Sequence, residues 1–236
     1  ALPSSFEGVG LHSEEFNNLS FDAGSFDRVS PRTEASLSKF RSEYSATGVE
    51  TDRASTAGIN YQPFKSLTTS LYLGHVEDIW NQYYADFDYT YVVSDLVSLN
   101  PGVHFYHTQD TGQALLGKID NNTYSLHFTV NAGHHSVTAA YQRVNGNTPF
   151  DYVTRGAIFI ANAVQMSDFN APNEKSWQAR YDLNMGAYGV PGLNLTALYV
   201  RGFDIDGTHV DPTGGYAYLG YGKGGKHWER DLEARY

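Results

Sequence analysis

The sequence predicts an all-β protein, an antiparallel up-and-down transmembrane β-barrel. Three observations lead to this fold class. About eleven segments alternate apolar and polar residues, and the connections between them alternate between short and long. In each segment one face carries apolar side chains and the other carries hydrogen-bonding side chains. The alternative is a soluble β-sandwich binding module, but a sandwich has no reason to sort its connections by side. We therefore expect the barrel.

The clearest hairpin covers residues 176–201. Its first strand has an apolar face formed by Trp177, Ala179, Tyr181 and Leu183. The intervening residues form a polar face, namely Gln178, Arg180, Asp182 and Asn184. Residues 189–192 then supply the backbone angles of a reversal, and the chain returns through Leu193, Leu195, Ala197 and Tyr199. A membrane barrel needs this arrangement, with an apolar outside and a polar lumen.

The same alternation predicts nine further strands, at residues 6–14, 19–27, 53–61, 67–74, 80–93, 97–106, 124–130, 137–142 and 228–236. No segment has a convincing helical pattern. Residues 28–52 are polar and poorly periodic, so we expect a loop there with a short ordered piece near residues 34–44.

The expected connections fall into two groups. Short turns lie at residues 62–66, 94–96, 131–135 and 188–192, and long connections lie at residues 28–52, 110–120, 146–174 and 205–226. Only the brief link at residues 77–79 departs from the alternation. Short turns on one side of a membrane and long loops on the other are typical of outer-membrane barrels.

Composition excludes several classes of protein. The 236 residues contain no cysteine, so there is no disulfide framework, and the net charge of −10 argues against a nucleic-acid partner. The 18 tyrosines, 13 phenylalanines and 23 glycines favour a β protein rich in turns. No apolar run approaches the roughly 18 residues of a membrane helix. This absence does not exclude a membrane barrel, whose strands carry a weaker signal.

The charged residues decide which face meets water. An arginine or lysine facing lipid near the midplane costs about 2–4 kcal/mol, and an acidic residue somewhat less. The polar face carries three groups of charged residues that would be destabilised by facing lipid, one each in the strands expected at residues 80–93, 176–184 and 228–236. We therefore expect this face to line a water-filled pore. The predicted pore-lining residues are Asp86, Asp88, Gln178, Arg180, Asp182, Glu233 and Arg235. Tyrosines on the opposite face suit lipid and its interfaces.

The long connection at residues 146–174 is unlike a solvated loop. Among its charged and amide residues it carries Phe150, Tyr152, Ile158, Phe159 and Ile160. Such a loop packs against something, whether the barrel interior, the barrel rim or a neighbouring subunit. If it folds inward, it narrows the pore and forms a constriction loop that places near the axis Asp151, Tyr152, Arg155 and Asp168.

Motifs for catalysis and for cofactor or metal binding are weak. The glycine-rich run at residues 220–226 precedes a strand instead of the helix that a phosphate site needs. Residues 204–207 begin like a calcium loop but lack its later glycine and glutamate. His134 and His135 have no partner ligand at a useful spacing, and no nucleophile motif is present. Asp86 and Asp88 suit a pore wall better than acid–base chemistry. We expect no enzyme, no cofactor and no metal site.

Several stretches resemble the OprD family of outer-membrane porins of Gram-negative bacteria, among them FEGVGLHSEEFNNLSFDAGSF, HVEDIWNQYY, NTPFDYV, FIANAVQMSDFNAPNEKSWQARYDLNMGAYGVPGL and DIDGTHV. The resemblance covers essentially the whole chain. It implies an 18-stranded barrel in outer-membrane lipid, with one pore per chain and a weak homotrimer. It also implies passive, substrate-selective diffusion of small solutes, mainly carboxylates or amino acids, through a narrow eyelet of inward-folded loops and past a ladder of basic residues.

Some residues of this chain match functional positions of the family. Arg235 resembles a basic ladder position, and Tyr152 and Asp168 resemble positions of the inward loop that border the eyelet. Ala157 and Ala163 stand where some members have serine, so a hydroxyl contact is not expected there.

Length and charge depart from the family pattern. Family members are much longer, so we expect residues 1–236 to be one β-barrel porin domain that is incomplete at both ends. The acidic balance of the chain also differs from a basic ladder. Either the ladder arginines lie mostly in the missing parts, or this member prefers cationic solutes.

Overall fold

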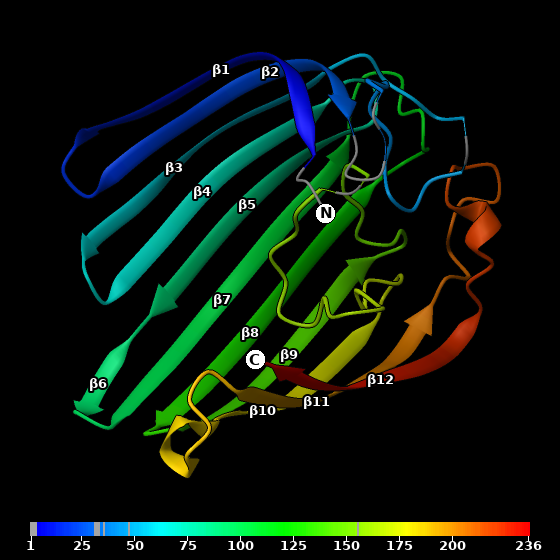
Figure 1. Ribbon diagram of the computed structural model, residues 1–236. Coiled ribbons are helices and arrows are strands. Elements are labelled where there is room, and N and C mark those ends of the chain that lie inside the picture. The colour runs from blue at the N-terminus through cyan, green and yellow to red at the C-terminus, as the bar shows by residue number, and fades with distance from the viewer. Residues whose placement is uncertain (1–3, 31–33, 35, 47, 155) are drawn as a thin grey trace.

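Twelve antiparallel strands form one sheet in the computed structural model, which describes residues 4–30, 34, 36–46, 48–154 and 156–236. Strand order follows the chain, except that the short β6 pairs with β7 alone (Figure 1). The strands are β1 (Ser5–Phe16), β2 (Leu19–Ser30), β3 (Ala54–Phe64), β4 (Leu67–Val76), β5 (Trp80–Tyr89), β6 (Tyr91–Ser94), β7 (Val97–Asp110), β8 (Asp120–Ala132), β9 (His135–Gly146), β10 (Lys175–Asn184), β11 (Asn194–Asp206) and β12 (Lys223–Arg235).

The eleven expected strands are present, and the antiparallel up-and-down, all-β fold class is confirmed. The hairpin of β10 and β11 pairs in unbroken register, from Lys175 opposite Phe203 to Asn184 opposite Asn194. The number of strands differs because the segment expected at residues 80–93 divides at Thr90. β5 pairs with both β4 and β7, whereas β6 pairs with β7 alone, so the pairing pattern changes at that residue.

Side chains alternate between two faces of the sheet because successive residues of a strand point to opposite sides. The strand register sets one row of residues side by side from β4 to β12, namely Ser70, Asp86, His104, Ser125, Gln142, Ser176, Gly202 and His227. We call the face that carries this row the polar face. The opposite, apolar face carries exposed large side chains that include Leu71, Tyr83, Phe105, Leu126, Phe128, Trp177 and Leu232.

The sheet curls around the connection between β9 and β10 (Figure 1). Gln142 of the polar face hydrogen-bonds to that connection, so the polar face is the concave one. β1 and β12 each pair with a single neighbour, so the strands described do not close on themselves. The structure does not support the soluble sandwich, because all of the described strands belong to one sheet and no second sheet covers it.

The connections sort into two ends of the sheet. One end carries the short turns at residues 17–18, 65–66, 95–96 and 133–134 and a reversal at residues 185–193. The other end carries long connections at residues 31–53, 111–119, 147–174 and 207–222 and the brief link at residues 77–79. Two single-turn 3-10 helices, η1 (Met185–Tyr188) and η2 (Ala217–Leu219), lie in connections where no helix was expected. No helix in the described part of the chain is long and apolar enough to cross a membrane.

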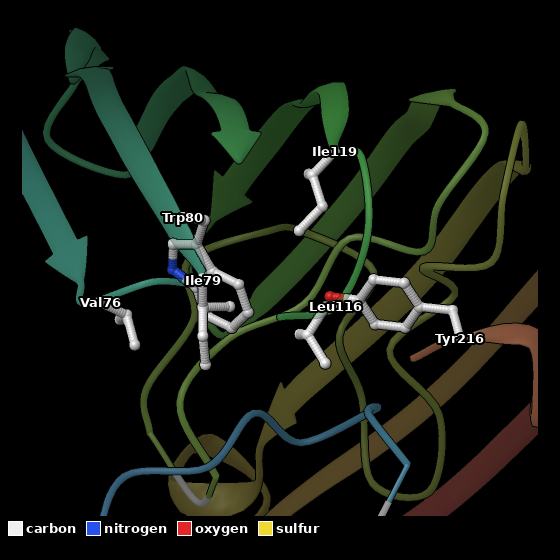
Figure 2. Close-up of a cluster of buried hydrophobic side chains, with 6 residues drawn as sticks. All are labelled: Val76, Ile79, Trp80, Leu116, Ile119 and Tyr216. Atoms are coloured by element: carbon white, nitrogen blue, oxygen red, sulfur yellow. The ribbon is translucent and has the colours of Figure 1, made fainter. Parts of the chain in front are cut away.

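A hydrophobic cluster joins the connections at the end with the long loops (Figure 2). Its buried members come from the β4–β5, β7–β8 and β11–β12 connections and the strand ends beside them, and they are Val76, Ile79, Trp80, Leu116, Ile119 and Tyr216. Full burial of one such side chain contributes about 1.5–3 kcal/mol. The cluster therefore holds three connections together at this end of the sheet.

Candidate functional site

The β9–β10 loop, residues 147–174, lies on the concave polar face (Figure 1). Gln142 of β9 is fully buried beneath it. Its side-chain amide donates to the carbonyl oxygens of Asp168 and Phe169, both at 2.9 Å, and its oxygen accepts from the amide of Asn162 at 2.9 Å. A side chain of the sheet thus satisfies three backbone groups of the loop.

Three further side chains of the polar face hold the middle of the loop. The Tyr106 hydroxyl accepts from the amide of Phe159 at 3.1 Å. Ser125 Oγ accepts from the amide of Ala161 at 3.0 Å, and Gln178 donates to the carbonyl of Ala161 at 2.9 Å. Gln178, one of the expected pore-lining residues, therefore lies beneath the loop and is only 6% exposed.

Apolar side chains of the loop fill two buried clusters on the same face. The first contains Phe150 and Ile160 of the loop with Tyr106 and Val144 of the sheet. The second contains Phe169 of the loop with Leu198 and Val200 of β11. The loop covers Leu198 and Val200, which interrupt an otherwise polar row. The apolar composition of the loop and this break in the alternation of β11 therefore have one cause.

Asp168 accepts hydrogen bonds from two tyrosines. Oδ2 lies 2.7 Å from the hydroxyl of Tyr44, in the β2–β3 connection, and 2.8 Å from the hydroxyl of Tyr152. The two rings meet edge to face, with centroids 6.0 Å apart. Burial, reinforced by the Asp168 carboxylate, raises the pKa of both hydroxyls well above the usual value for tyrosine. Both tyrosines therefore stay protonated and serve as donors to a carboxylate.

Asp151 joins the same two connections from a buried position. Its Oδ1 accepts from the amide of Tyr44 at 3.0 Å and from the amide of Tyr152 at 2.7 Å. Burial raises the pKa of Asp151 to about 6, although these hydrogen bonds favour the charged form. At 4% exposure it anchors the loop from within. Arg155, the remaining residue expected in this loop, lies outside the described residues.

The expected residues of β10 and β12 form two ion pairs on the polar face. The guanidinium of Arg180 binds the carboxylate of Asp182 through two hydrogen bonds of 2.7 Å. Arg235 donates to Glu233 at 2.6 Å. All four side chains are partly exposed and line a hollow toward the end of the sheet that carries the short turns.

Asp86 and Asp88 lie apart from those pairs, on β5. They line a second hollow of about 500 Å³ between the sheet and the β9–β10 loop, which contributes Ala157 and Phe159 to it. None of the described residues that line this hollow is a lysine or an arginine. The expected pore-lining residues thus form an acidic group on β5 and a mixed-charge group on β10 and β12, with the β9–β10 loop between them.

Sequence reasoning missed several residues that build this site. Tyr44 lies in a segment that is polar and aperiodic in sequence, so nothing indicated its contact with Asp168. Glu174 is 1% exposed and its carboxylate binds Nε2 of His227 at 2.5 Å and the amide of Ala171 at 2.9 Å. The only feature of the sequence that pointed to Glu174 was its position directly before β10. The pairing with His227 depends on strand register, which the sequence pattern does not give.

Comparisons with known proteins agree with this architecture. The family model described as "outer membrane porin, OprD family" matches residues 1–236. Porin D of Pseudomonas aeruginosa is 43% identical over 246 residues, covering 100% of this chain and 55% of that protein. The porin-like protein GalP of Pseudomonas putida is 29% identical, covering 87% of this chain and 50% of that protein.

Solved structures show the same likeness. The crystal structure of Pseudomonas aeruginosa OccD3 (OpdP) has a TM-score of 0.94 and 46% identity, covering 99% of this chain and 59% of that one. A crystal structure of Pseudomonas aeruginosa OprD has a TM-score of 0.90 and 42% identity, with the same two coverages. The chain spans between half and three fifths of the length of these relatives. The chain belongs to the OprD family of outer membrane porins.

Proposed function

We propose that this chain forms part of the wall and the constriction of a channel through which small solutes diffuse passively and selectively across the outer membrane of a Gram-negative bacterium. The observation that carries the proposal is the packing of the β9–β10 loop on the concave polar face, fixed by Gln142 and two buried apolar clusters. A loop held inside a barrel narrows it without closing it. Residues 1–236 are, in this proposal, one porin domain.

The pore-lining assignment follows from the charges on the polar face. The predicted wall residues are Asp86, Asp88, Gln178, Arg180, Asp182, Glu233 and Arg235, and the predicted constriction residues are Asp151, Tyr152, Arg155 and Asp168. Facing lipid would cost about 2–4 kcal/mol for an arginine near the midplane. Tyr152 and Asp168 are partly exposed and hydrogen-bonded to each other, whereas the buried Asp151 and Gln178 hold the loop in place.

The two charged groups of the wall favour amino acids as solutes, with carboxylates second. Asp86 and Asp88 present negative charge to a hollow without lysine or arginine in its described lining, which suits an ammonium group. Arg180 and Arg235 on the facing strands can attract a carboxylate, although each is paired with an acidic residue. An amino acid carries both charges and can use both sides of the constriction.

Single-channel recording in planar bilayers tests the proposal. The intact protein should conduct, and arginine should block or carry current at lower concentration than benzoate does. Asp86→Asn with Asp88→Asn should weaken the arginine effect about tenfold and leave the benzoate effect unchanged. Benzoate should act more weakly after Arg180→Gln. A protein that inserts into the bilayer and shows no conductance would overturn the channel, whereas conductance without any preference would overturn only the solute assignment.

The partners in this proposal are outer-membrane lipid on the apolar face and two further copies of the chain in a weak homotrimer. The exposed aromatic and aliphatic side chains of that face support the lipid contact. Native mass spectrometry of the intact protein in detergent tests the assembly. A trimer that dissociates on dilution supports it, and a monomer at every concentration would contradict it.

A further inference from the structure

One carboxylate and two imidazoles meet on the polar face. Asp88 lies on β5, His104 on β7 and His127 on β8, and one ligand atom from each lies within 4.8 Å of the other two. All three side chains are half-buried. The sequence motifs did not connect these residues, because they belong to three different strands.

Strand register builds this cluster around a glycine. Asp88 lies opposite Gly102 on β7, and Gly102 lies opposite His127 on β8. Because Gly102 has no side chain, Oδ1 of Asp88 and Nε2 of His127 meet above it at 3.2 Å. A Cβ atom at position 102 would lie 2.0 Å from Asp88 Oδ1 and 2.1 Å from Cε1 of His127. The glycine therefore provides the space in which the two groups approach each other.

His104 completes the cluster from the next position on the same face of β7. Its ring stacks on that of His127, with centroids 5.5 Å apart. The hydroxyl of Tyr84 lies 3.0 Å from Nδ1 of His104 and holds the ring in place. Metal-binding histidines usually have such a hydrogen-bond partner on the nitrogen that faces away from the metal.

The spacing suits a small divalent ion. Four-coordinate Zn²⁺ has bonds of about 2.0–2.1 Å, so its donor atoms lie about 3.3 Å apart. Asp88 and His127 already have this separation, and the ligand atom of His104 lies within 4.8 Å of both. Asp86, two residues from Asp88 on the same face, adds a second negative charge beside the cluster.

We propose that Asp88, His104 and His127 bind a divalent transition-metal ion such as Zn²⁺ in the wall of the polar face. Two imidazoles and a carboxylate are donors that Zn²⁺, Ni²⁺ and Cu²⁺ accept, whereas Mg²⁺ and Ca²⁺ prefer oxygen donors alone. Asp88 and His104 also line the hollow of about 500 Å³, which leaves space beside the cluster for water or a solute as a fourth ligand. Binding does not require the protein to conduct, so this proposal is independent of the proposed channel function.

Isothermal titration calorimetry of the intact, untagged protein with ZnCl₂ tests the site, with MgCl₂ as the comparison. We expect one Zn²⁺ per chain and no Mg²⁺ binding at the same concentrations. Asp88→Asn and His127→Gln should each weaken Zn²⁺ binding by at least tenfold. Tyr84→Phe should weaken it about tenfold, because loss of an orienting hydrogen bond typically costs 10–100-fold in metal affinity.

Two control variants separate this cluster from the other histidines. His107→Gln removes an imidazole from the apolar face of β7, and His134→Gln removes one from the β8–β9 turn. Both should bind Zn²⁺ as the unmodified protein does. Absorption bands of tetrahedral Co²⁺ in the unmodified protein would support the site without any variant. Zn²⁺ affinity that is unchanged in Asp88→Asn and His127→Gln, or no Zn²⁺ binding at all, would overturn the proposal.

Discussion

The hydroxyl of Tyr44 donates a hydrogen bond to Oδ2 of Asp168 at 2.7 Å, across 124 residues of chain. Tyr152 donates to the same oxygen at 2.8 Å. The two bonds tie the β2–β3 connection to the β9–β10 loop. The position of the proposed constriction therefore depends on a residue from a distant connection.

Tyr44→Phe should loosen the β9–β10 loop. A hydrogen bond to a charged group contributes about 1.5–3 kcal/mol, so the substitution should lower the protection of the loop amides from hydrogen exchange by about tenfold or more. Mass spectrometry of peptides from residues 147–174 measures this effect. Tyr61→Phe changes an exposed tyrosine of the apolar face and should leave the loop unaffected. Unchanged protection in Tyr44→Phe would show that the bond does not hold the loop.

The loop should become less stable as the pH rises through about 6. Burial raises the pKa of Asp151 to about 6 in the folded protein, about two units above its value in an unfolded chain. Between pH 4 and 6 the folded state therefore binds more protons than the unfolded state. The stabilisation is complete below about pH 4 and is lost as the pH rises above 6, a change of about 3 kcal/mol at most.

Hydrogen exchange at several pH values, corrected for intrinsic rates, checks this dependence in residues 148–154. Asp151→Asn should abolish it, because the amide does not titrate. Asp211→Asn alters an exposed carboxylate in a different connection and should preserve the dependence. If Asp151→Asn and the unmodified protein lose protection equally between pH 4 and 7, another group is responsible.

Gln142→Leu should widen the proposed channel. The substitution leaves the carbonyls of Asp168 and Phe169 and the amide of Asn162 without the partners that Gln142 supplies. Each unsatisfied buried group costs about 1–3 kcal/mol, enough to release the loop from the polar face. Single-channel conductance should rise and become noisier. Thr138→Val, on the same face of β9, removes only a bond to Thr129 and should conduct normally. Equal conductance in both variants would contradict the constriction.

Gly202→Ala should lower the thermal unfolding midpoint measured by circular dichroism in detergent. An added Cβ would lie 2.0 Å from Oε1 of Glu174 and 2.7 Å from the ring of His227, so the buried carboxylate and the partly exposed imidazole would have to separate. Overpacking of this kind costs about 1–3 kcal/mol. Gly74→Ala is the matched control, since its nearest contact would be an ordinary 3.8 Å. Midpoints that fall equally in both variants would rule out a specific role for the pair.

The strands were predictable because each one shows its two faces locally. In β10, Trp177 and Tyr181 alternate with Gln178 and Arg180, so a short window of sequence suffices. The break at Thr90 was not predictable, since alternation continues through it and only the pairing partners change.

The contacts between loops and across strands were beyond the sequence pattern. The apolar side chains at positions 146–174 indicated that this loop packs against another part of the protein. They did not indicate which side chains of the sheet it contacts. Asp88 and His127 meet only because register places both beside Gly102. Such a meeting depends on the relative offset of three strands, and alternation within a single strand does not report that offset.

The central claim is that the polar face lines a water-filled pore and the apolar face meets lipid. The 236 residues contain no cysteine, so single cysteines can be placed on neighbouring residues of opposite faces. On β5 the Asp86→Cys variant is compared with Phe87→Cys, and on β10 the Arg180→Cys variant is compared with Tyr181→Cys. The measurement is the change in single-channel conductance when a membrane-impermeant charged thiol reagent is added. We predict that the reagent alters conductance in Asp86→Cys and Arg180→Cys and leaves the other two unchanged. A response confined to Phe87→Cys and Tyr181→Cys would contradict the account.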